Sequence, residues 1–76
     1  MEAEVLKVRD LPVVAVLIMN KCDFIDMERK GNVCWFIFKK KERAEKLQNA
    51  YYEGSLEVNA KHFYDTVRDL KGKIFS

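Results

Sequence analysis

The sequence of 76 residues is 49% hydrophobic and 34% charged, which predicts one small globular domain over residues 1–76 and excludes a disordered chain. Its formal net charge of +2 is too small to indicate nucleic-acid binding by itself. The longest apolar run, Leu11 to Met19, is shorter than the roughly 20 residues of a membrane span, and the acidic N-terminus is unlike a signal peptide, so we expect a cytoplasmic protein with no membrane partner.

The first part of the chain predicts a strand followed by a buried helix. Glu4 to Arg9 contains the β-branched residues of a short strand. The run from Leu11 to about Asn20 is apolar on every side, which suits a buried helix, although a buried strand has the same pattern. Asp10 as a helix cap and Pro12 in the first turn favour the helix.

A β-hairpin is the clearest local feature. Its strands are Asp23 to Arg29 and Val33 to Lys39, and Gly31 supplies the positive φ that a tight turn needs. Pairing centred on Lys30 and Gly31 is the register that we expect. Because the first of these strands is half polar, one face of the sheet should be only partly covered.

Two helices complete the predicted fold. From Lys41 to Glu53 the apolar residues have helical spacing, and Gly54 stands where a helix end favours a left-handed residue. Asn59 is expected to cap a last helix with one apolar face, which Gly72 is expected to end or fray early. Together these elements predict an α+β fold in which a three-stranded, mainly antiparallel sheet packs with three helices.

Three stretches resemble a small domain family of unknown function that occurs in bacterial and phage proteins. They are VRDLPVVAVLIMNK, FIDMERKGNVCWFIF and AYYEGSLEVNAKHFYDTVRDLKGKIFS, and they cover almost the whole chain. The resemblance implies a compact domain built as strand, buried helix, β-hairpin and two C-terminal helices, often encoded near phage or mobile elements. It implies no activity, ligand or catalytic residue. Lys39, Lys40 and Lys41 depart from the family pattern, in which an acidic or small polar residue follows the third strand.

The strand VCWFIF, residues 33–38, is apolar on both faces. Alternate side chains point to opposite faces, so one face carries Val33, Trp35 and Ile37, and the other carries Cys34, Phe36 and Phe38. We expect these side chains to be core or interface, with Trp35 facing the helices. An exposed apolar patch is the alternative.

The residues after this strand form a basic corner, which is the first candidate binding surface. The corner consists of Lys39, Lys40, Lys41, Arg43 and Lys46. Lysines at a helix N-terminus oppose the helix dipole, and no capping side chain precedes them, a break in local rules that is common at functional sites. A solvated corner that discourages strand pairing is the simpler interpretation, and an anionic partner is the alternative.

Tyr52 and Tyr64 are the candidate interaction aromatics. Each comes one position after an apolar-stripe residue of its helix, so its hydroxyl is expected to reach water. Stacking on bases would suit such side chains, but the sequence has no recognised RNA- or DNA-binding signature.

The residues needed for catalysis or metal binding are sparse. Cys22 and Cys34 lack CxxC spacing, and His62 does not complete a four-ligand zinc site with them unless a carboxylate joins. The expected hairpin register puts Cys34 opposite Met27, so we expect two core thiols and no disulfide. No nucleophile has an evident partner, and we predict no enzyme activity, no cofactor and no metal.

Two classes of function remain. We expect a non-enzymatic protein–protein interaction module that self-associates as a homodimer or docks on a larger partner, because association adds apolar burial that a 76-residue monomer lacks. The alternative is a nucleic-acid-binding accessory protein that uses the basic corner, with Tyr52 or Tyr64 stacking on bases. Salt dependence separates the two, since phosphate binding weakens steeply with salt.

Overall fold

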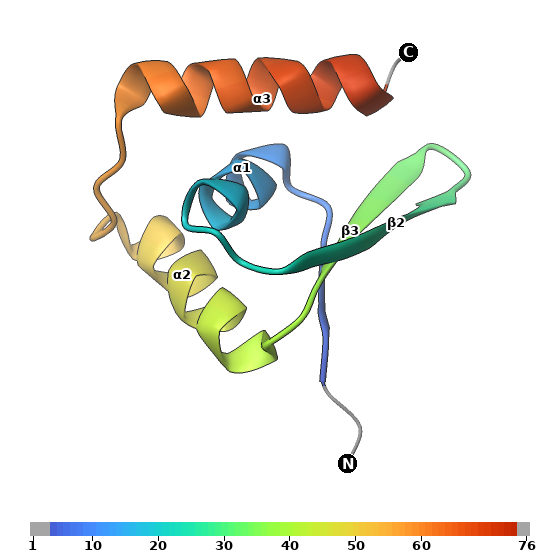
Figure 1. Cartoon of the computed structure of the whole chain (residues 1–76), viewed down its shortest axis with the longest axis horizontal. Coiled ribbons are helices and arrows are strands. Elements are labelled where there is room, and N and C mark those ends of the chain that lie inside the picture. Colours follow the sequence, from blue (N-terminus) through green and yellow to red (C-terminus); the bar gives the residue numbers. More distant parts are fainter. Residues whose placement is uncertain (1–3, 75–76) are drawn as a thin grey trace.

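The computed structural model describes residues 4–74 and contains the predicted α+β fold (Figure 1). The elements in chain order are β1 (Leu6–Val8), α1 (Leu11–Met19), β2 (Phe24–Lys30), β3 (Val33–Phe38), α2 (Lys41–Glu53) and α3 (Ala60–Ile74). The three strands form an antiparallel sheet in the order β1-β3-β2, so β3 is the central strand and β2 lies at an edge. Among the elements of this described part, no helix is both long enough and apolar enough to span a membrane.

The helix α1 is the buried centre of the fold, which decides between the helix and the strand that its sequence allowed. Residues 13–17 are fully buried, and both α2 and α3 pack against α1. Burial on all sides explains why the run has no polar stripe. The predicted side-chain cap is wrong, however: Asp10 occupies the N-cap position, but its carboxylate accepts a hydrogen bond from the hydroxyl of Tyr52 instead.

The helices α1 and α2 end in the same left-handed motif. Cys22 after α1 and Ser55 after α2 each donate a backbone N–H to the carbonyl oxygen five positions earlier, both at 3.0 Å. The left-handed residue in α2 is Gly54 (φ 77°), as predicted. In α1 it is Lys21 (φ 59°), a residue type that gives no sign of this conformation.

The helix α3 begins at the predicted cap and extends past the predicted end. The side-chain oxygen of Asn59 accepts a hydrogen bond from the N–H of His62 at 2.9 Å. Gly72 does not end the helix, which continues to Ile74. The apolar face of α3 packs against the core through buried Leu70 and its partly buried neighbours along the helix.

The hairpin register differs by two residues from the predicted one. Gly31 (φ 60°) and Asn32 form a two-residue loop, so Cys34 pairs with Arg29 and not with Met27. A shift by an even number of residues keeps each side chain of β3 on its expected face. Gly31 lies in the turn as predicted, but the loop consists of Gly31 and Asn32 and not of Lys30 and Gly31.

A β-bulge at Ile25 changes the face to which the start of β2 points. The register shifts between Phe24 and Asp26, so strict alternation does not hold there. The ring centroid of Phe24 lies 6.0 Å from that of Phe36 and 5.7 Å from that of Phe38. The bulge therefore brings Phe24 to the same face of the sheet as the core rings.

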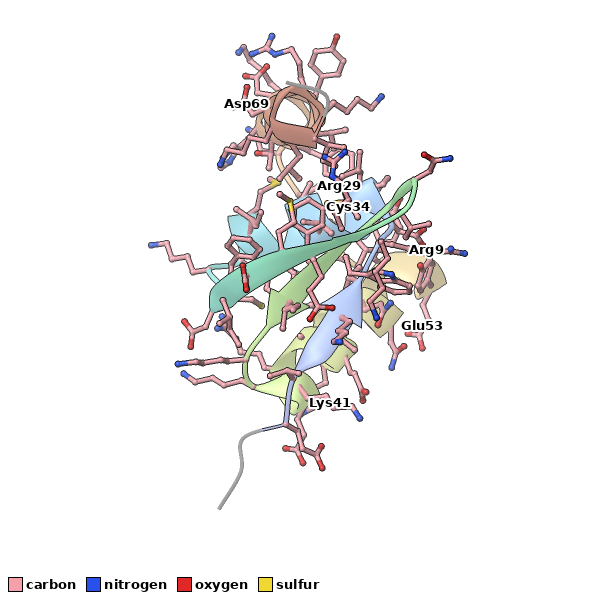
Figure 2. The ribbon with its side chains drawn as sticks, turned by 90° about the vertical axis from the view of Figure 1, so that its right-hand side faces the viewer. Arg9, Arg29, Cys34, Lys41, Glu53 and Asp69 are labelled. Atoms are coloured by element: carbon pink, nitrogen blue, oxygen red, sulfur yellow. The ribbon has the colours of Figure 1, made fainter. Side chains whose placement is uncertain are left out.

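The prediction that Trp35 faces the helices is wrong. Phe36 and Phe38 are buried in the core together with α1, while Trp35 lies on the opposite face and is half-buried. The guanidinium carbon of Arg9 lies 5.7 Å from the Trp35 ring centroid on that face. Figure 2 shows the strands in front of α1 and α2, and no described helix covers this side of the sheet, which confirms a partly covered face.

Candidate functional site

The basic corner has acidic neighbours, two of which, Asp23 and Glu4, only the fold brings there. The Lys40 ammonium lies 3.4 Å from the carboxylate of Asp23. The Lys41 ammonium lies 4.0 Å from the carboxylate of Glu4 and 3.7 Å from that of Glu45. These exposed ion pairs reduce the positive field that a polyanion would meet at this corner.

Arg43 belongs to the corner in sequence but binds the end of α1. Its Nη2 donates to the carbonyl oxygen of Asn20 at 2.8 Å, and its Nη1 donates to that of Lys21 at 3.4 Å. A cation at a helix C-terminus offsets the negative end of the helix dipole. Lys39 and Lys46 are exposed and form no ion pair within residues 4–74, so they are the corner's two unengaged cations in that part of the chain.

Neutralising the lysines of the corner is expected to leave the fold intact. Replacing Lys39, Lys40 and Lys41 together by glutamine removes only exposed ion pairs and also relieves the start of α2, so the free energy of unfolding should change by about 0.5 kcal/mol or less. Thermal unfolding checks this stability. The parent and the variant should bind single- and double-stranded oligonucleotides equally weakly in a fluorescence titration at low and physiological salt. Micromolar binding by the parent at physiological salt, lost in the variant, would instead support the nucleic-acid alternative.

Tyr52 and Tyr64 do not form one surface. The Tyr52 hydroxyl donates to the carboxylate of Asp10, and its ring meets that of Tyr51 edge-on with centroids 5.6 Å apart. The hydrogen bond to Asp10 raises the pKa of Tyr52, because it stabilises the protonated phenol. Tyr64 on α3 is 66% exposed and makes no hydrogen bond or ring contact with the other described residues. Tyr52 therefore links α2 to the start of α1, and Tyr64 is the unengaged ring.

A groove between β2 and α3, here called the β2–α3 groove, gathers exposed apolar side chains. Its volume is about 250 Å³. Phe24, Ile25 and Met27 line its β2 side and are 48%, 43% and 38% exposed. Phe36 and Leu70, which are buried core residues, also line it. The hydrophobic core thus opens to the surface between the edge strand and the last helix.

The polar groups of the groove come from both of the elements that flank it. Asp26 of β2 and Lys73 of α3 line the walls. The Arg29 side chain extends toward α3 (Figure 2), and its Nη2 donates to the carbonyl oxygen of Ile74 at 2.6 Å. This hydrogen bond ties the C-terminal end of α3 to β2.

Sequence reasoning missed this groove. Strict alternation grouped Phe24 with Asp26 and Glu28 on a polar face of β2, and the bulge that moves Phe24 has no signature in the sequence. The one local signal was Ile25 and Met27, two apolar residues that alternate along a charged strand. Ile25 and Met27 lie at a sheet edge only because β1 pairs with the other side of β3, and the sequence does not show this strand order.

The uncovered face of the sheet is more polar than the groove. Trp35 lies in a shallow depression with Lys7, Glu28 and Lys30. The Lys7 ammonium and the Glu28 carboxylate form an ion pair at 3.2 Å. Charged side chains thus surround the indole ring, and this face has less exposed apolar surface than the groove.

The thiols and the histidine lie apart from the groove lining. Cys22 and Cys34 are free and partly buried against the core, and burial raises the pKa of Cys22, which lowers its reactivity. His62 is exposed in the first turn of α3. Within residues 4–74, no group of three or more histidine, cysteine, aspartate or glutamate side chains is placed to hold a metal ion.

Comparison with protein families gives a match that agrees with the strand, helix, hairpin and two-helix order seen here. The family model described as Domain of unknown function (DUF5659) matches residues 4–76. The chain belongs to this family. This confirms the resemblance noted in the sequence. Comparison with curated proteins found no significant match, and comparison with solved structures found none either.

In this DUF5659 domain the exposed apolar side chains are concentrated at one place. Three of the large exposed apolar side chains of residues 4–74 meet in the β2–α3 groove, next to the buried core. The basic corner is partly neutralised, and the two tyrosines are separate. The β2–α3 groove is the best candidate functional site.

Proposed function

We propose that this DUF5659 domain is a non-enzymatic protein-interaction module that binds its partner through the β2–α3 groove. The observation that carries the proposal is the exposure of Phe24, Ile25 and Met27 beside a floor of core side chains. Soluble monomers seldom expose contiguous apolar surface without a use, and such patches mark binding sites. Association would remove this surface from water, which stabilises a complex by about 25 cal/mol per Å² of apolar area.

The chemistry of the groove supports binding over catalysis. Its polar lining consists of one carboxylate, from Asp26, and one amine, from Lys73, while the remaining lining is apolar. Acid–base catalysis needs groups held at hydrogen-bond distance from a reacting atom and tuned in pKa. An apolar groove with a polar residue on each wall is the usual composition of a recognition site.

A charge placed in the groove is expected to weaken partner binding strongly. Met27→Glu puts a carboxylate in the apolar lining, and affinity should fall at least about tenfold because the charge must be desolvated on binding. Val58→Glu is the matched control, because Val58 and Met27 are each 38% exposed and Val58 lies in the link before α3. The measurement is capture of proteins from the native host by the tagged domain, quantified by mass spectrometry, together with sedimentation for self-association.

Both variants must first show the circular dichroism and thermal unfolding of the parent. The proposal holds if partner capture or self-association disappears in Met27→Glu and persists in Val58→Glu. It fails if the parent and the Met27→Glu variant retain the same bound proteins and the same sedimentation behaviour. Capture that depends on salt but not on Met27 would instead favour the basic corner.

A further inference from the structure

We infer that the β2–α3 groove binds an extended peptide segment, which adds to the outer edge of β2 as a fourth strand of the sheet. This inference rests on the proposed function and names its partner class. β2 is an edge strand, and the groove runs beside it. Strand addition of this kind combines main-chain hydrogen bonds with pockets for alternate side chains.

The register shows which main-chain groups of β2 are free for such pairing. Lys30 and Val33 flank the two-residue loop and form a hydrogen-bonded pair, and every second pair along the hairpin is hydrogen-bonded in the same way. Met27 and Arg29 occupy the alternate positions. Their N–H and C=O groups therefore point away from β3, toward the outer edge.

The side chain of Asp26 already accepts a hydrogen bond from one of these free donors. The N–H of Met27 donates to Oδ1 of Asp26 at 2.7 Å. Charged side chains at sheet edges block unwanted strand pairing. The Asp26 carboxylate stands where the carbonyl oxygen of an added strand would accept the same hydrogen bond, so it acts as a placeholder that the peptide displaces.

The position of α3 restricts the occupant to a single extended segment. Figure 2 shows α3 on the β2 side of the sheet, beyond the edge strand, and the Arg29–Ile74 hydrogen bond holds its end there. Neighbouring strands lie about 4.8 Å apart, so a lone strand can follow the edge. The outer edge of β2 in a second copy is free in the same way, but the sheet and the α3 helix beside that edge would meet α3 of the first copy. The outer edge of β2 therefore has room for a single extended peptide but not for the sheet of a second folded copy.

Charge complementarity defines the peptide further. Lys73 lines the α3 wall, and the Arg29 guanidinium donates to the carbonyl oxygen of the next residue along α3, Ile74. An anionic group on the peptide is favoured near these two cations. Apolar side chains at alternate positions would enter the groove against Met27 and Leu70. The expected ligand is an extended segment with alternating apolar residues and an anionic group, supplied by an acidic side chain or by a terminal carboxylate.

The test uses random nonapeptides displayed on phage, selected against the full chain. Enriched sequences should have apolar residues at every second position together with an acidic residue or a preference for a free C-terminus. The best peptide is then synthesised with a free carboxylate and with an amide, and affinity lost in the amide assigns the anionic group to the terminus. NMR hydrogen exchange should show slower exchange at the Arg29 amide in the complex.

Asp26→Ala provides the decisive variant. Without the Asp26 carboxylate the Met27 N–H is free for the peptide, and the anionic group of the peptide loses a repulsion. Affinity should therefore rise at least about fivefold, the value of one net hydrogen bond. Asp69→Ala is the control, because Asp69 is an exposed carboxylate on α3 that does not line the groove. Unchanged affinity in Asp26→Ala, no enriched peptide, or enrichment with helical spacing would overturn strand addition. Where strand addition is overturned, the proposed function still stands if Met27→Glu abolishes the capture of a folded partner. If Met27→Glu has no effect on capture either, the strand addition and the proposed function both fail.

Discussion

Replacing Phe38 by alanine is expected to lower the free energy of unfolding by about 3–5 kcal/mol, because a cavity replaces a fully buried ring. The Phe38 side chain is inaccessible to solvent and packs in the core with α1. Small domains have only about 5–15 kcal/mol of total stability, so this variant should lose much of its cooperative transition at ordinary temperature. Urea and thermal unfolding followed by circular dichroism provide the measurement.

The comparison variant is Trp35→Ala, three positions earlier on the opposite face of the same strand. Trp35 is half-buried and lies beside charged side chains. Trp35→Ala should therefore lower the free energy of unfolding by about 1–2 kcal/mol, because it removes buried apolar area and the contact of the ring with Arg9. The difference between the two variants measures which face of β3 the helices cover. Equal destabilisation, or a larger effect at Trp35, would mean that the indole and not Phe38 belongs to the core.

Exchanging the left-handed residues that follow α1 and α2 is expected to shift stability in opposite directions. Lys21→Gly should stabilise the domain by about 1 kcal/mol, because glycine adopts positive φ without the cost that a Cβ imposes. Gly54→Ala should destabilise by a similar amount, about 1 kcal/mol. A Cβ at Gly54 meets no atom within 4 Å, so only the backbone conformation (φ 77°) opposes it.

Both substitutions leave the main-chain hydrogen bonds of the motif in place. They also leave the hydrogen bonds that the Arg43 side chain donates to the carbonyl oxygens of Asn20 and Lys21. Urea midpoints with unchanged slopes isolate the stability change. A destabilised Lys21→Gly variant would show that the lysine side chain contributes more than its conformation costs. An unaffected Gly54→Ala variant would show that α2 does not end in a left-handed residue in solution.

The secondary structure could be predicted because its signals are local. The limits of α1, α2 and β3 and the start of α3 lie within one or two residues of those expected from periodicity, from Gly54 and from Asn59. Each signal acts within one turn of helix or one loop, so it is present in the sequence whatever surrounds it. The family resemblance and the three-stranded sheet with three helices followed from the same local order.

The candidate site was only partly visible in the sequence. The basic corner lies within residues 39–46 and is evident in the sequence, but only the structure shows that Asp23 and Glu4 lie beside it and partly neutralise it. The β2–α3 groove was not found. It requires β2 to be an edge strand and Ile25 to form a bulge, and both depend on pairing with a strand that lies elsewhere in the chain.

By itself, then, the sequence determined which segments are helices and strands, where most of them end, and that β3 is apolar on both faces. Only the tertiary structure decided that Phe36 and Phe38 face inward and Trp35 outward, and that Lys21 adopts a left-handed conformation. The physical reason is symmetry: a strand with apolar side chains on both faces gains similar burial either way. The packing of α1 against one face breaks that symmetry, and its position depends on the whole chain.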